Sequence, residues 1–380
     1  MNFELTDEQR QVKELCRDFA ENELRPHAKA WDEGHVFPAE AVKKLGEMGL
    51  LGVAVPSEWG GAGMDAVTYA LAMEEISRGC AGTGVIMSVN NSLYCDPVLK
   101  YGTDEQRTTL LAPFARGEKL GAFALTEPMS GSDASEMKTT AVAHGDDWVL
   151  NGAKNFITNG PQADAVLVFA VTDRAKGHKG ISAFIVPADA KGFTRGKPDD
   201  KVGIRASGTC SLFFEECVLP RRYLLGQAGD GFKIAMGTLD GGRIGIAAQA
   251  LGIARAAFEE ARAYAKERHA FGQPIAKLQA IQLMLADMAT ELDAARLLVL
   301  RAAAMKDRGQ RHSAESAMAK LYASEMSERV TSKAIQIHGG YGYTKDFDVE
   351  RHWRDSRITE IYEGTSEIQR IVIAAATLKD

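Results

Sequence analysis

The hydrophobic pattern of this chain changes twice, and these changes constrain its fold more than any other feature of the sequence. The first third has apolar residues at helical spacing, as in Ala39 to Met48 and Asp65 to Arg78. The middle third has β-branched and aromatic runs punctuated by turn residues: Val166 to Val171, Ile181 to Val186 and Ser211 to Val218. After Gly231 long helical patterns return. The chain therefore reads as helices, then a β region, then helices.

The spacing within each region predicts its architecture. No long helical pattern separates the β runs, which favours an antiparallel barrel or sandwich over βαβ units. In the last third Ile281, Leu285, Met288 and Leu292 recur on one helical face, and Ala314 to Ile337 continues this pattern, which is typical of an antiparallel bundle. We therefore expect a multi-domain α and β protein with an N-terminal helical domain (1–117), a middle antiparallel β domain (118–228) and a C-terminal helical bundle (229–380).

Composition argues against several classes of protein. The 380 residues carry a formal net charge of -6, which argues against a nucleic-acid binder. The five cysteines are odd in number and form no CxxC motif, and no HxxxH or HExxH pair occurs, so we expect neither a disulfide framework nor a metal site. No run of about 18 apolar residues is present to span a membrane. The acidic start, Met1 to Glu8, predicts a cytoplasmic protein, or a mitochondrial matrix protein if a leader was removed.

Three segments are candidates for chemistry, although neither GxGxxG nor GxxxxGK[ST] occurs, so a nucleotide cofactor must be held outside a Rossmann domain. In residues 123–133, hydroxyls and backbone N–H groups surround Gly131, as suits a phosphate or a heteroaromatic edge. The other two are 156–160 and 361–370, where Gly364 permits close backbone approach and Thr365 or Ser366 can cap a helix. Taken singly, each also fits a plain interpretation: a turn between domains, a strand ending in an Asn-Gly turn, and a surface carboxylate, Glu363, at a helix start.

Six separated motifs, taken together and in order, carry a resemblance. They are Leu125-Thr126-Glu127-Pro128 with Gly131-Ser132-Asp133, Phe156-Ile157-Thr158-Asn159-Gly160, Leu239-Asp240-Gly241-Gly242-Arg243, Arg268 with Phe271-Gly272, Gln336 to Gly342, and Tyr362-Glu363-Gly364-Thr365. The whole chain resembles the acyl-CoA dehydrogenase family and is most similar to its short-chain, or butyryl-CoA, branch. The resemblance implies the same three-part fold in a homotetramer. It also implies FAD between the β domain and the bundle, with a neighbouring subunit completing the site.

The resemblance also assigns cofactor contacts. Phe123 to Ser132 would line the flavin and reach its pyrophosphate, and Thr158 would lie close to N5. Many members carry Trp where Phe156 stands, so an electron-exit role of that indole is not carried over. Contacts to the FAD of a partner subunit would come from Arg268 with His269 and Ala270, from Gln279, and from a binding loop at Gln336 to Gly340. Thr365 to Glu367 would contact the adenosine half of FAD. The implied cofactor contacts are Phe123, Leu125, Thr126, Gly131, Ser132, Phe156, Ile157, Thr158, Arg268, Phe271, Gln279, Gln336, Gly339, Gly340, Thr365 and Glu367.

Glu363 matches the catalytic base of the family, and the positions that touch acyl-CoA are matched by Ser132, Asp240, Arg243 and Gly364. The resemblance implies that Glu363 removes the α proton of the thioester while FAD N5 takes the β hydride. The product would be a trans-2-enoyl-CoA, and the electrons would pass to electron-transfer flavoprotein. Desolvation should raise the pKa of Glu363 and so make it a better base. From the residues alone, Arg243 could instead pair within a helix, and Gln336 could be a buried amide.

The substrate expectation depends on two departures from other branches. Some relatives carry the base just before the arginine that matches Arg243, where this chain has Gly242, which favours Glu363. Glutaryl-type members carry an Arg before the segment matching Met87 to Val89, where this chain has Gly84, Val85 and Ile86 nearby. A short straight-chain acyl-CoA is therefore expected. The alternatives are a branched- or medium-chain dehydrogenase, an acyl-CoA oxidase, and a non-catalytic acyl-CoA-binding flavoprotein on the same scaffold.

Overall fold

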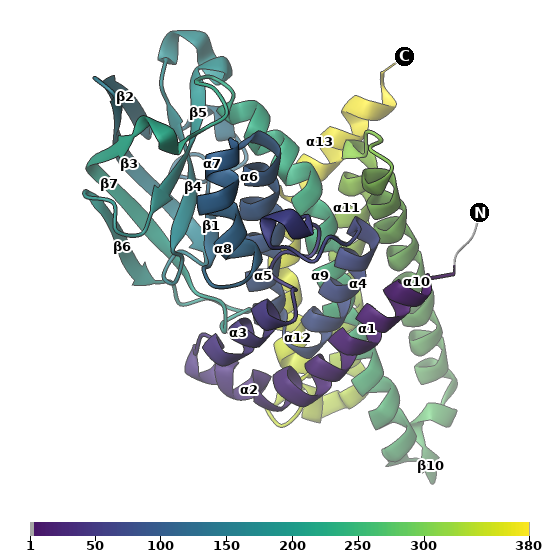
Figure 1. Cartoon of the computed structure of the whole chain (residues 1–380). Coiled ribbons are helices and arrows are strands. Elements are labelled where there is room, and N and C mark those ends of the chain that lie inside the picture. The colour runs from purple at the N-terminus through teal and green to yellow at the C-terminus, as the bar shows by residue number, and fades with distance from the viewer. Residues whose placement is uncertain (1–3, 380) are drawn as a thin grey trace.

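The computed structural model describes residues 4–379 and has two helical regions and one β region (Figure 1). The N-terminal helices are α1 (Asp7–Phe19), α2 (Arg25–Gly34), α3 (Ala39–Glu47), α4 (Ala66–Gly79), α5 (Ala81–Ser88), α6 (Asp96–Tyr101), α7 (Asp104–Gln106) and α8 (Ala112–Ala115). Helices α3 and α4 confirm the two helical patterns expected in the first third. All five cysteines are buried and free.

Side-chain caps fix where the first helices begin. Thr6 and Gln9 form a capping box at the start of α1, because each side chain binds the backbone N–H of the other. Asp65 caps α4 by accepting a hydrogen bond of 2.6 Å from the N–H of Thr68. Every residue of α4 except Val67 is buried, so this helix lies inside the protein rather than on its surface.

The β region is a single eight-stranded sheet in the order β6-β7-β3-β2-β4-β5-β8, with β1 paired to β4. The strands are β1 (Gly121–Ala124), β2 (Thr140–His144), β3 (Asp147–Thr158), β4 (Ala165–Val171), β5 (Ile181–Pro187), β6 (Phe193–Pro198), β7 (Thr209–Pro220) and β8 (Leu224–Leu225). Most neighbours are antiparallel, as expected, but β1 runs parallel to β4, and β2 meets β4 in a short parallel pairing. The sheet is therefore mixed, because β1 enters from the N-terminal helices beside a strand in its own direction.

The C-terminal region is built on long helices. These are α9 (Gly231–Glu267), α10 (Gln279–Asp307) and α11 (Ser313–His338), followed by the shorter α12 (Val349–Arg357) and α13 (Ser366–Thr377). A small hairpin of β9 (His269–Ala270) and β10 (Gln273–Pro274) joins α9 to α10. In Figure 1 the hairpin lies at the foot of the bundle, while α13 and the C-terminus lie at its opposite end.

The N-terminal helices and the bundle share one hydrophobic core. Met73 of α4 packs in the same cluster as Leu251 of α9 and Met288 of α10. Buried charges connect the same helices, because Arg255 donates to Glu74 at 2.8 Å and to Glu75 at 2.7 Å. Although burial opposes it, Arg296 and Arg255 hold the pKa of Glu74 below its usual range. This core fixes α9, against which the turn carrying Glu363 is placed.

Candidate active site

Glu363 lies in a strained turn between a 3-10 turn (Ile358–Glu360) and α13. Its φ is +52° and that of Gly364 is +92°, so both adopt the left-handed region that disfavours a side chain such as glutamate. Two buried side chains hold this turn. Lys320 Nζ donates to the carbonyl of Gly364 at 2.7 Å, and Gln369 Nε2 donates to the same carbonyl at 2.8 Å. A strained residue persists only where its surroundings fix it, and such residues concentrate at functional sites.

The carboxylate of Glu363 lies directly against Gly242 of α9. A Cβ built on Gly242 would overlap Oε2 of Glu363 and would lie 2.9 Å from Cδ2 of Leu93. Glu363 is half-buried as a residue, but its Oε2 atom is buried and accepts no hydrogen bond from the described residues. Burial raises the pKa of Glu363 to about 7, although the charges of Lys320 and Arg243 oppose the rise. The side chain is therefore a desolvated carboxylate poised to take up a proton near neutral pH.

Arg243 and Asp240, the predicted substrate contacts on α9, form one polar group beside this carboxylate. Arg243 is buried, and its Nη1 donates to Oδ1 of Asp240 at 2.6 Å. Ser313, the first residue of α11, donates its hydroxyl to the other oxygen of Asp240. The Nε of Arg243 is buried without a partner among residues 4–379. The helix pairing that the sequence left open is present, and the guanidinium still has one unmatched donor.

A small apolar cluster joins this turn to the first segment predicted to line the flavin. Leu93, Ile204 and Ile253 form part of it, and Phe123 and Tyr362 both pack against it. The hydroxyl of Tyr362 donates to Oε1 of Gln249 on α9. Phe123 of β1 and the residue preceding Glu363 are therefore brought into one neighbourhood, although they are far apart in the sequence.

A buried ion pair fixes the loop that follows β1. Nζ of Lys154 on β3 lies 2.8 Å from Oε1 of Glu127 and also donates to the carbonyl of Leu125 at 3.1 Å. The same carboxylate accepts from the backbone N–H groups of Lys138 and Thr139. Further along the loop, Ser132 is exposed and Gly131 has no atom within 4 Å of an added Cβ. The loop is thus anchored at its base and open at its tip, which suits contact with a bound group.

The second segment predicted to line the flavin ends β3 with an irregularity between Lys154 and Ile157. Phe156 there has a φ of +58° and is 65% exposed, while Ile157 is buried and Thr158 is half-buried. Asn159 donates its side-chain amide to the carbonyl of Gly121 at 3.1 Å, which ties this segment to β1. An exposed aromatic ring on a fixed backbone fits a planar ligand ring such as a flavin.

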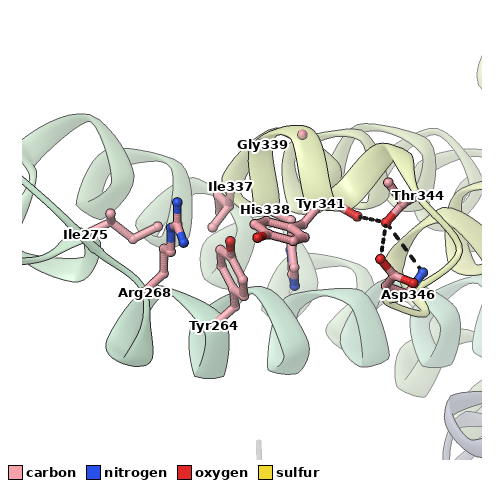
Figure 2. A pocket seen from close by; sticks show the side chains of 10 residues that line it. Tyr264, Arg268, Ile275, Ile337, His338, Gly339, Tyr341, Thr344 and Asp346 are labelled. Atoms are coloured by element: carbon pink, nitrogen blue, oxygen red, sulfur yellow. Dashed lines mark hydrogen bonds between the residues drawn. The ribbon is translucent and has the colours of Figure 1, made fainter.

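A separate group of predicted cofactor contacts lies at the foot of the bundle. Arg268, Gly339 and Gly340 line a pocket of about 480 Å³ whose walls include Tyr264 and Tyr341 (Figure 2). The guanidinium of Arg268 lies 5.6 Å over the ring of Tyr341. Phe271 is 90% exposed, and Gln279 and Gln336 are also exposed. The reading of Gln336 as a buried amide is therefore wrong, because it faces outward from the last turn of α11.

Within one chain, the predicted cofactor contacts near Glu363 and those near Arg268 lie far apart. Arg243 lies beside Glu363, and Arg268 caps the far end of the same helix, α9. At a rise of about 1.5 Å per residue, these two positions lie roughly 37 Å apart. The remaining predicted contacts, Thr365 and Glu367, stay with Glu363: Thr365 caps α13 by accepting from the N–H of Ile368, and Glu367 is exposed in its first turn.

Sequence reasoning missed the buried polar residues that support the site. Lys320, Gln369 and Lys154 have no exposed surface, yet each bonds to a segment that carries predicted site residues. A signal was present in the sequence: Lys320 interrupts a run of small and apolar residues on α11, and Lys154 stands at an inward position of β3.

Within residues 4–379, no group of three or more His, Cys, Asp or Glu side chains is placed to hold a metal ion. No helix in that part of the chain is both long and apolar enough to cross a membrane.

Comparison with known protein families matches nearly the whole chain. The N-terminal, middle and C-terminal domains of acyl-CoA dehydrogenases match residues 6–118, 122–217 and 229–378. The chain belongs to the acyl-CoA dehydrogenase family. The three-part fold expected from the sequence is thereby confirmed, and the protein is a FAD-dependent oxidoreductase that acts on acyl-CoA.

Individual relatives in this family match over the full length. The mitochondrial short-chain specific acyl-CoA dehydrogenase of Bos taurus is 58% identical over 378 residues, covering 100% of this chain and 92% of the relative. The butyryl-CoA dehydrogenase structure from Megasphaera elsdenii matches with a TM-score of 0.98 and 45% identity, covering 100% of both chains. A chain in a structure of the electron transferring flavoprotein of Acidaminococcus fermentans has a TM-score of 0.99 and 50% identity, also covering 100% of both chains.

Proposed function

We propose that this acyl-CoA dehydrogenase oxidises a short straight-chain acyl-CoA to the trans-2-enoyl-CoA, with Glu363 as the base that takes the α proton. The observation that carries the proposal is the buried, unpartnered Oε2 of Glu363 against Gly242. A carboxylate in water is a weak base, whereas burial raises the pKa of Glu363 to about 7. That value is near the operating pH, where a general base works best.

The residues around Glu363 position its carboxylate and set its pKa. The left-handed turn aims the carboxylate at Gly242, and the absence of a side chain there leaves room for it. Arg243 and Lys320 limit the rise of its pKa, so that a large fraction stays ionised at neutral pH. The substrate loses its α proton to Glu363 and a hydride from its β-carbon, so one C=C bond forms. FAD, when bound, supplies the acceptor for that hydride.

The cofactor contacts proposed on this chain fall into two parts. Phe123, Thr126, Phe156 and Thr158 would hold the flavin near Glu363, with Gly131 and Ser132 toward the pyrophosphate. Arg268, Phe271, Gln279, Gln336, Gly339 and Gly340 lie at the other end of α9 and would serve a partner's cofactor. This separation supports the homotetramer, since a single chain presents two incomplete halves of the site.

The proposed substrate and the proposed electron acceptor are inferred from the relatives of this chain. Proteins named for short-chain and butyryl-CoA substrates are similar to this chain over its whole length, which supports a short acyl chain. The likeness to a chain in the electron transferring flavoprotein structure supports that flavoprotein as the electron acceptor. Location in the cytoplasm, or in the mitochondrial matrix after removal of a leader, stays a prediction.

The deciding experiment is anaerobic reduction of the purified yellow protein by butyryl-CoA, in wild type and in Glu363→Gln. The amide is nearly isosteric, so FAD and acyl-CoA should stay bound. Loss of a positioned base should slow bleaching by about 10²–10⁴-fold or more. The control is Glu40→Gln, which removes an exposed carboxylate from the first turn of α3, outside every proposed contact, and should bleach normally.

The outcomes separate the alternatives. Normal bleaching by Glu363→Gln would show that another residue is the base, and a wild type that no acyl-CoA bleaches would indicate a non-catalytic flavoprotein. Rates from butyryl-CoA through palmitoyl-CoA and branched acyl-CoAs then test the chain length. A maximum at long or branched chains would overturn the short-chain proposal, and rapid reoxidation by oxygen in place of electron-transfer flavoprotein would favour an oxidase.

A further inference from the structure

We propose that Lys320 is a positioning residue for the base: through the carbonyl of Gly364 it holds the turn that carries Glu363, and its charge keeps that carboxylate ionised near neutral pH. The inference rests on the proposed role of Glu363 and extends it to a second side chain on α11. Lys320 touches the turn and does not need to touch the substrate.

The placement of Lys320 is unusual for a lysine. It has no exposed surface and is surrounded on α11 by Ala317, Ala319 and Ala323, which are also fully buried. A buried ammonium is costly unless it is hydrogen-bonded and paired with a negative charge. Lys320 donates a hydrogen bond of 2.7 Å to the carbonyl of Gly364. The negative charge that most favours its ionised form is the carboxylate of Glu363. Both partners belong to the turn of the base.

The turn needs such a fixed partner. Glu363 and Gly364 both have positive φ, and a glutamate held there is strained. Gln369 Nε2 donates to the carbonyl of Gly364 at 2.8 Å and to that of Glu363 at 3.3 Å. The Gly364 carbonyl therefore accepts from one charged and one neutral donor, and only the charged donor also acts on the carboxylate.

The charges around Glu363 define what Lys320 contributes. Lys320 and Arg243 both favour the ionised carboxylate, and Arg243 is itself paired with Asp240. The hydroxyls of Tyr69 on α4 and of Tyr362 also interact with the charge of Glu363. Their pKa values are raised, mainly by burial and further by that charge. The charges that act on Lys320 are those of Glu363, Arg243, Glu360 and Glu367.

Burial brings the pKa values of Glu363 and Lys320 closer together. It raises the pKa of Glu363 to about 7 and lowers that of Lys320 to about 8, while each charge opposes the shift of the other. Between these values both groups are mostly ionised. Without the ammonium the pKa of Glu363 rises further, so the carboxylate form that abstracts a proton is reached only at higher pH.

The test compares the pH dependence of flavin bleaching by saturating butyryl-CoA in wild type, Lys320→Met and Lys333→Met. Lys333 is the matched control, since it lies on the same helix, is partly buried and pairs with Asp287 and Glu291. For Lys320→Met we expect a rate at pH 7 at least about tenfold lower and an acid limb moved up by about one pH unit, with FAD content and acyl-CoA binding unchanged. Lys333→Met should keep the wild-type profile.

Two further variants separate charge from geometry. Gln369→Met removes the neutral donor and leaves the charge, so the plateau rate should fall while the acid limb stays in place. Lys320→Gln keeps a donor and loses the charge, so the limb should move as in Lys320→Met. A readout that does not use catalysis is the pH at which the gain in thermal midpoint of Glu363→Gln over its parent stops growing, because that gain levels off at the folded-state pKa of Glu363. That pH should be higher when the parent carries Lys320→Met.

These results can overturn the inference without touching the proposed function. If wild type bleaches and Lys320→Met keeps the wild-type acid limb, Lys320 has no such role. Loss of FAD or of the folded oligomer in both Lys320→Met and Lys320→Gln would make Lys320 a structural residue and would equally refute the inference. If no acyl-CoA bleaches the wild type, the proposed function itself fails.

Discussion

The carboxylate of Glu363 occupies the space that a side chain on Gly242 would need, although the two residues come from different parts of the bundle. In the family's other arrangement a glutamate at the position of Gly242 would carry the base. Here a side chain at position 242 and the observed position of the Glu363 carboxylate exclude each other. The proposed role of Glu363 as the base therefore depends on two features, the glutamate present at 363 and the side chain missing at 242.

Gly242→Ala should displace the base without disturbing the fold. The new methyl group overlaps Oε2 of Glu363, so the carboxylate must rotate away and the bleaching rate with butyryl-CoA should fall by at least about tenfold, as a small misplacement of a reacting group does. The control is Gly237→Ala on the same helix, where an added Cβ meets only the Tyr101 hydroxyl at 3.4 Å. Equal rates for wild type and Gly242→Ala would contradict the geometry described.

Glu363→Gln should make the protein more stable at neutral and alkaline pH. The fold raises the pKa of Glu363 from 4.5 to about 7, so its ionised form is disfavoured in the folded state. Wild type therefore loses stability as pH rises through this window, whereas the amide does not titrate. At 1.36 kcal/mol per pKa unit the gain above pH 7 is at most about 3 kcal/mol, and it should vanish below pH 4.5.

Thermal midpoints of the two proteins between pH 4 and pH 9 measure this difference directly. A difference that does not change with pH would show that the carboxylate of Glu363 is solvated.

The ion pair between Glu127 and Lys154 should be essential for the loop that it anchors. Lys154→Met leaves a buried carboxylate without its cation, which costs about 3–5 kcal/mol. Urea denaturation should show that loss, and FAD retention should fall with it because the Leu125 carbonyl also loses its donor. The double variant Glu127→Leu with Lys154→Met should recover stability but not FAD binding. Recovery of both would mean that the pair only fills the core.

Mixed oligomers should test whether a site is shared between chains. Arg268→Ala and Glu363→Gln should each be inactive alone, the first through weak FAD binding and the second through loss of the base. Co-assembly of the two chains should restore activity, since one type of site then has both residues intact. If the mixture stays as inactive as its components, Arg268 acts on the site of its own chain or not at all.

The sequence predicted the regular parts of this protein because periodicity reports burial directly. The stripe of Ile281 to Leu292 became α10, and the β-branched run of Val166 to Val171 became β4 with every residue buried. The parallel entry of β1 was not predictable, because strand direction depends on where the preceding helices leave the chain.

For the site, motif order identified Glu363 and the loop around Gly131, but not the side chains beneath them. Lys320, Lys154 and Gln369 act through backbone carbonyls, and a hydrogen bond to a carbonyl leaves no pattern in the sequence of its acceptor. The contact of Glu363 with Gly242 likewise depends on the packing of α9 against a turn formed much later in the chain.

The core shared by α4 and the bundle has a consequence for how the chain is made. Glu74 and its partner Arg255 are separated by 181 positions, and Met73 packs against residues just as distant. On the ribosome the first three helices and α4 emerge long before α9 exists to cover them. Their apolar faces stay open to water during that interval, so the nascent N-terminal half is a natural client for chaperones. The core on α4 is complete only after α9 and α10 have left the exit tunnel.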